Sequence, residues 1–175
     1  NSRGLKILKL RNCNFRSIER NFLNFSNFPL LNYLDLSYNQ IEQIFIDLIF
    51  FSVINSEQNN FKVLNLTRNN LLFFNITKTF FVSLIDLSFN KLSHFDNQYF
   101  YHLPTSKIIV NNNNLSKMSF VKGDLWLGND NNLEELECLF DGRELVQINL
   151  NNNQIRVLRS YCFSLSNNLK LYYLR

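Results

Sequence analysis

The sequence predicts a single α/β repeat solenoid, with a curved parallel sheet on the concave side and short helices, 3-10 turns and loops on the convex side. Two observations predict this fold class. A short apolar phrase recurs along the chain, and each copy places a polar residue where the alternation predicts a core-facing side chain. The 175 residues suffice for one substantial core, and nothing in the composition requires a second domain.

The phrase is clearest in "IDLSFNKL", from Ile85 to Leu92, and it returns as "LDLSYNQI", "LNLTRNNL", "IIVNNNNL" and "INLNNNQI". Aligned on the second apolar strand residue, the copies recur about every 23 residues, at Leu10, Leu36, Leu66, Leu87, Val110, Leu127 and Leu150. An eighth copy begins with Leu171 and Leu174. We therefore expect residues 1–175 to form one domain of about seven repeats plus a truncated eighth, as a fragment of a longer protein.

The spacing of Val82, Ile85, Leu87, Asn90 and Leu92 resembles the leucine-rich repeat family, in the subtype typical of extracellular animal proteins. The resemblance covers nearly the whole chain and implies a solenoid that binds other proteins. The succession of "IIVNNNNLSKMSF", "LWLGNDNNLEEL" and "LVQINLNNNQIRVL" further resembles the central repeats of the mosquito leucine-rich-repeat immune proteins, over about residues 82 to 165. Those proteins are secreted and escort a complement-like thioester protein to pathogen surfaces. This chain departs from them at Phe120, near the place where they carry a cysteine.

The recurring asparagine has a structural explanation. Where the chain turns away from a strand, backbone N–H and C=O groups are left inside, and a side-chain amide supplies both a donor and an acceptor for them. We expect a buried asparagine ladder along the solenoid, formed by Asn39, Asn69, Asn90, Asn113 and Asn153. The first copy, "LKLRNCNF", has Cys13 in the place of the amide.

The copy "GDLWLGNDNNLEEL" is irregular. Its Leu125 and Leu127 fit the two inward strand positions, but an extra residue then precedes Leu133. Either Asp130 or Asn131 must take the ladder position.

Binding residues are expected on the concave face, because alternate strand residues point away from the core. Large side chains at such positions have no core to fill, and aromatic and arginine side chains are typical of interface hot spots. The predicted protein-binding residues are Tyr33, Tyr38, Arg68, Phe89, Ile109 and Trp126. Trp126 is the strongest single candidate, and the alternative interpretation is a scatter of surface hydrophobic residues.

Other function classes find little support in the sequence. The net charge of +4 comes from lysines and arginines scattered among acids, so no basic stripe indicates nucleic-acid binding. The longest apolar run, "IFIDLIFFSVI" from Ile44 to Ile54, is too short for a membrane span. His94 and His102 have no nucleophile or carboxylate placed beside them by the repeat. We therefore expect no enzyme activity, no cofactor and no metal site.

The cellular location is predicted from sequons. Candidate N-glycosylation sites occur at Asn24, Asn65, Asn75 and Asn114. They favour a secreted protein with a role in innate immune recognition. The alternatives are the ectodomain of a Toll-like or adhesion receptor, and an intracellular leucine-rich repeat scaffold in the cytoplasm. The ligand, the oligomeric state and the pairing of Cys138 and Cys162 stay open.

Overall fold

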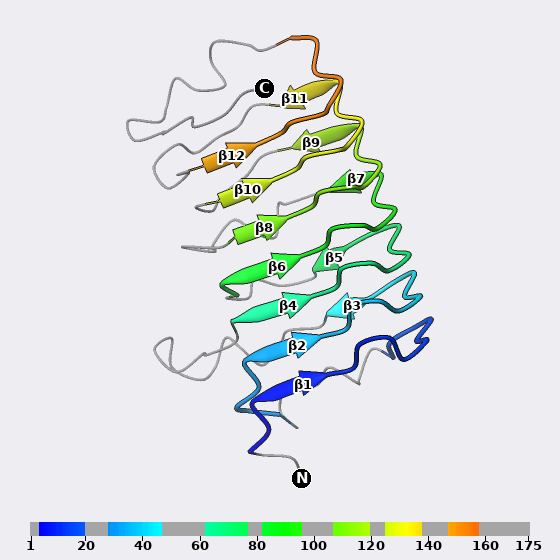
Figure 1. The fold of residues 1–175 in the computed structure, drawn as a ribbon, viewed down its shortest axis with the longest axis vertical. Helices are drawn as coiled ribbons and strands as arrows, with labels where there is room; N and C mark the ends of the chain where they lie inside the picture. Colours follow the sequence, from blue (N-terminus) through cyan, green and yellow to red (C-terminus); the bar gives the residue numbers. More distant parts are fainter. Residues whose placement is uncertain are drawn as a thin grey trace.

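The computed structural model describes residues 4–19, 28–46, 62–76, 82–95, 107–119, 125–137 and 147–157. Seven three-residue strands form one parallel sheet in the order β1-β2-β4-β6-β8-β10-β12. The strands are β1 (Ile7–Lys9), β2 (Tyr33–Asp35), β4 (Val63–Asn65), β6 (Leu84–Asp86), β8 (Lys107–Ile109), β10 (Leu125–Leu127) and β12 (Gln147–Asn149). Figure 1 shows them stacked along the long axis of the molecule, each beside the next strand of this sheet in the sequence.

A second row of strands, each two or three residues long, follows the turns of the first row (Figure 1). A two-stranded sheet contains β3 (Phe45–Ile46) and β5 (Asn75–Ile76), and a three-stranded sheet contains β7 (His94–Phe95), β9 (Lys117–Ser119) and β11 (Glu135–Glu137). Both sheets are parallel.

This arrangement confirms the predicted parallel sheet and is compatible with a solenoid-like repeat. The described ranges contain strands, turns and bends but no helix. The segments expected to form convex helices fall mainly outside those ranges. The apolar run from Ile44 to Ile54 begins with β3, and its remainder also lies outside them.

The core lies behind the long sheet, because the middle residue of each strand and the residue just after the strand point inward. Leu34 in β2 and Leu36 just after it are fully buried, as are Ile85 in β6 and Leu87 just after it. Phe74, just before β5, and Phe95, in β7, stack with ring centroids 6.5 Å apart. Since one strand cannot bury these residues alone, the core exists only through stacking of successive units.

The asparagine ladder is present. Asn90 donates from Nδ2 to the carbonyls of Leu66 and Leu87, both at 2.9 Å, and its Oδ1 accepts the N–H of Leu71 at 3.0 Å. Equivalent bonds join each ladder residue to the unit before it, for Asn39, Asn69, Asn113 and Asn153. Asn131 adds a sixth member, with bonds to Val110 and Leu115. The amides therefore satisfy the backbone groups that the turns leave inside.

The inward positions predicted for β10 are wrong by one residue. Trp126 is fully buried, whereas Leu125 and Leu127 are only half-buried, and Gly128 takes the second inward position. A Cβ on Gly128 would meet Leu150 Cδ2 at 3.0 Å and Val110 Cγ2 at 3.7 Å. The space beside Gly128 is thus filled by Leu150 and Val110. Together, the large indole and a residue without a side chain take a packed volume close to that of two leucines. With this register no extra residue precedes Leu133.

Candidate functional site

The long sheet has an outward face, which we name the strand face. It is formed by the first and third residues of each strand, since the middle residues point into the core. The parallel register aligns the first residues in one column: Ile7, Tyr33, Val63, Leu84, Lys107, Leu125 and Gln147. The third residues form the second column: Lys9, Asp35, Asn65, Asp86, Ile109, Leu127 and Asn149. The first column is apolar or aromatic over four successive strands.

Several polar groups of the second column are already engaged. Asp35 Oδ1 accepts the N–H of Ser37 at 2.9 Å, and Asp86 Oδ1 accepts the N–H of Ser88 at 3.0 Å. Asn65 Oδ1 accepts from both the N–H and the hydroxyl of Thr67. These bonds fix the first residues of the turns that follow β2, β4 and β6.

A third column stands at the corner of each turn, three residues after the end of each long strand. We name its members the corner residues: Asn12, Tyr38, Arg68, Phe89, Asn112, Asp130 and Asn152. All seven have left-handed backbones, with φ between 54° and 57°. Asparagine and aspartate tolerate this conformation, whereas for Tyr38, Arg68 and Phe89 it costs about 1–2 kcal/mol each.

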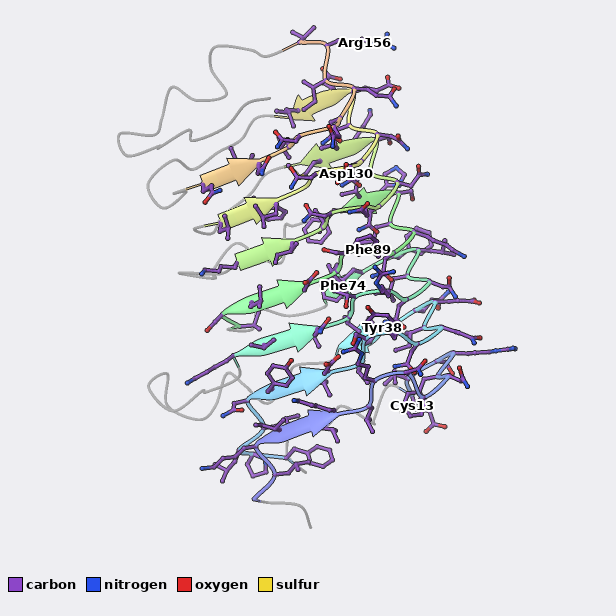
Figure 2. All side chains as sticks on the ribbon, in the orientation of Figure 1. Cys13, Tyr38, Phe74, Phe89, Asp130 and Arg156 are labelled. Atoms are coloured by element: carbon purple, nitrogen blue, oxygen red, sulfur yellow. The ribbon has the colours of Figure 1, made fainter. Side chains whose placement is uncertain are left out.

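The three strained corners form a stack with Arg11, which we name the cation–aromatic ladder. Arg11 Cζ lies 4.2 Å from the centroid of the Tyr38 ring. Arg68 Cζ lies 5.3 Å from the Tyr38 centroid and 4.3 Å from that of Phe89. Tyr38 and Phe89 remain 41% and 44% exposed. Figure 2 shows Tyr38, Phe89 and then Asp130 following one another along the molecule. Each exposed cation–π contact stabilises the fold by only about 0.5–1 kcal/mol.

The corner column is polar beyond the ladder. Asn152 Nδ2 donates to Asp130 Oδ1 at 2.7 Å. Two residues further on in each turn, Asn132 bonds Asn114, and Gln154 Nε2 donates to Asn132 Oδ1 at 3.3 Å. Among the corner residues, the aromatic side chains are therefore confined to Tyr38 and Phe89, in the units of β2 and β6.

The six predicted binding residues fall in three places. Tyr33 and Ile109 are on the strand face, and Tyr38, Arg68 and Phe89 are corner residues. Trp126 is a wrong prediction, because it is buried in the core and packs edge-on against Phe95, with ring centroids 5.5 Å apart. Whether the five residues bind a protein stays a prediction.

Three residues of this surface were missed. Leu125 and Leu127 lie on the strand face, although the sequence placed them in the core, and Arg11 joins the ladder by contacting Tyr38. The position of Leu133 in the sequence could have identified Leu125 and Leu127 as outward residues. Counting back from the apolar residue that follows the ladder amide assigns Trp126 and Gly128 to the core. No sequence signal pairs Arg11 with a ring 27 residues later.

Two of the four sequons have described side chains. Asn65 is partly exposed on the strand face, and Asn114 is exposed in a turn. Asn75 lies in β5, and Asn24 lies outside the described residues.

The described residues show little that is suited to catalysis. His94 is exposed, and its Nδ1 lies 2.9 Å from the hydroxyl of Ser93, the residue beside it in sequence. Cys13 is a free, exposed thiol. In the ranges that the structure describes, no three His, Cys, Asp or Glu side chains gather as a metal site. Within the same ranges, no helix has the length and apolar character of a membrane span.

No protein-family model matches the chain, and no curated protein matches it either.

Proposed function

We propose that this chain is a protein-binding module, built as a leucine-rich repeat solenoid whose concave side is the strand face. One observation supports it above the others. Apolar and aromatic side chains continue from strand to strand on a surface that the core does not use. Seven strands about 4.8 Å apart give a strip of roughly 30 Å, which is long enough for a protein-sized contact. A sheet fixed by the asparagine ladder would lose little conformational entropy on binding.

The same proposal places the module outside the cell, in a secreted protein of innate immunity. Its support is the set of sequons, of which Asn65 and Asn114 are reached by solvent. A glycan on Asn65 would stand on the strand face and obstruct it, so the proposed binding requires Asn65 to be unmodified. The intact mass of the native protein before and after N-glycan removal tests this location.

Blocking the strand face should weaken binding without unfolding the chain. The test selects peptides from a random-peptide display library on the immobilised chain and then compares them on two variants. Leu84→Lys places a charge at the centre of the apolar column, and Phe73→Lys makes an equivalent change at a residue that is 57% exposed just before β5. We expect selected peptides to bind the wild type and Phe73→Lys, but to bind Leu84→Lys about tenfold more weakly.

Leu125→Lys provides a second, independent block of the same column, and thermal unfolding of each variant verifies the fold. Peptides that bind all variants equally, or a library that yields no binders, would contradict the proposal.

A further inference from the structure

Tyr38 and Phe89 are unexpected at their positions. The corner backbone is left-handed in all seven units, and four units fill it with asparagine or aspartate, which tolerate that conformation. Three consecutive units instead use bulky residues there, and two of these residues leave more than two fifths of an aromatic side chain in solvent. Strained residues that burial does not require are characteristic of binding sites. The cation–aromatic ladder is therefore better explained by an external contact than by folding.

The guanidinium groups define the chemistry of that contact. Stacking on a ring occupies the face of a guanidinium and leaves the N–H donors along its edge available. Neither Arg11 nor Arg68 forms a salt bridge within the described part of the chain. The nearby carboxylates of Asp35 and Asp86 each use Oδ1 to accept a backbone N–H. Planar, bidentate donors of this kind match carboxylates.

The distance between the two guanidinium groups limits how two carboxylates of a bound partner can be spaced. Arg11 Cζ and Arg68 Cζ lie on either side of Tyr38, 4.2 Å and 5.3 Å from its centroid, so they are at most about 9.5 Å apart. An extended polyproline-type chain rises about 3.1 Å per residue and repeats every three residues. Acidic residues separated by two others would thus face both guanidinium groups.

A protein segment suits this surface better than a nucleic acid. A polyphosphate carries a charge at every step and would meet the partly exposed carboxylate of Asp86 on the adjoining strand face. The Tyr38 ring already has guanidinium groups 4.2 Å and 5.3 Å from its centroid, from the units before and after it, and these would compete with a base for that ring. The adjoining apolar column, with Tyr33, Val63 and Leu84, offers contacts to uncharged side chains between the acids.

We propose that the cation–aromatic ladder of Arg11, Tyr38, Arg68 and Phe89 receives an extended acidic segment of the partner protein, with two carboxylates separated by two residues. This rests on the proposed function and names the chemistry of its ligand. The carboxylates pair with the Arg11 and Arg68 guanidinium edges, and the residues between them pack against the exposed rings.

Fluorescence anisotropy with a labelled Glu-x-x-Glu peptide carrying apolar residues at the x positions tests this inference. The comparison ligands are its Gln-x-x-Gln counterpart and a single-stranded oligonucleotide. Arg11→Gln and Arg68→Gln remove the ladder charges one at a time. Arg16→Gln and Arg156→Gln remove the same charge from exposed residues outside the ladder, and Arg156 lies toward the opposite end of the molecule from Cys13 (Figure 2).

We expect about tenfold weaker binding for either ladder variant and for the glutamine peptide, with both control variants within about twofold of wild type. Equal losses in all four variants would overturn the inference in favour of net charge alone. Failure of the acidic peptide to bind, or stronger binding of the oligonucleotide, would also overturn it. If peptides from the display library depend on Leu84 but lack acidic residues, this inference is wrong and the proposed function stands.

Discussion

Replacing Trp126 with alanine should lower the free energy of unfolding by about 3–5 kcal/mol. The indole is fully buried and contacts Phe95 edge-on. Since small domains are stable by only about 5–15 kcal/mol, this single change removes a large part of the total. Denaturant unfolding followed by circular dichroism measures it.

Leu127→Ala is the matched control, because Leu127 neighbours Trp126 but points to the strand face. Leu127→Ala should lower the free energy of unfolding clearly less than Trp126→Ala does. Trp126 is also the only tryptophan in the chain, so native fluorescence should be blue-shifted and shielded from a soluble quencher. A larger loss for Leu127→Ala, or a freely quenched tryptophan, would restore the register in which Leu125 and Leu127 face the core.

Asn90→Leu should destabilise the fold by about 1–3 kcal/mol even though it adds apolar volume. The change leaves the Leu71 N–H and the carbonyls of Leu66 and Leu87 without the partner that the amide provides. Equilibrium unfolding in denaturant gives the difference.

Asn132→Leu is the control, because the Asn132 side chain is exposed and bonds only to other side chains. Surface changes of this kind stay within about 0.5 kcal/mol. If the two variants lose the same stability, the ladder hydrogen bonds contribute nothing beyond surface polarity.

The sequence predicted much of the core because periodicity and chemistry agree there. Leucines alternate with outward residues, and each buried amide recurs three residues after an inward apolar residue, as Asn90 does after Leu87. The same periodicity assigned the wrong inward residues to β10. "LWL" alternates like its neighbours, and a local alternation cannot distinguish an inward Trp-Gly pair from an inward Leu-Leu pair. Only the fixed distance to Leu133 separates the two registers.

The site was less predictable than the core. Tyr38 and Phe89 stand out as large residues in a turn, so composition and position suffice to find them. The ladder depends on the left-handed corner backbone and on Arg11 contacting a ring in the next unit, and neither is visible in a linear pattern. The strain at the corners is therefore information that the structure adds.

Phe89→Asn tests most directly whether the exposed aromatic corners serve binding and not folding. Asparagine fits the left-handed backbone, and only an exposed ring contact is lost, so the free energy of unfolding should stay within about 1 kcal/mol of wild type. Affinity for the peptides that depend on Leu84 should fall about tenfold. Phe73→Asn, an exposed phenylalanine outside the ladder, should leave that affinity unchanged. A loss of stability above about 2 kcal/mol with unchanged peptide affinity would show that the corner aromatics belong to the fold, and would contradict the binding role.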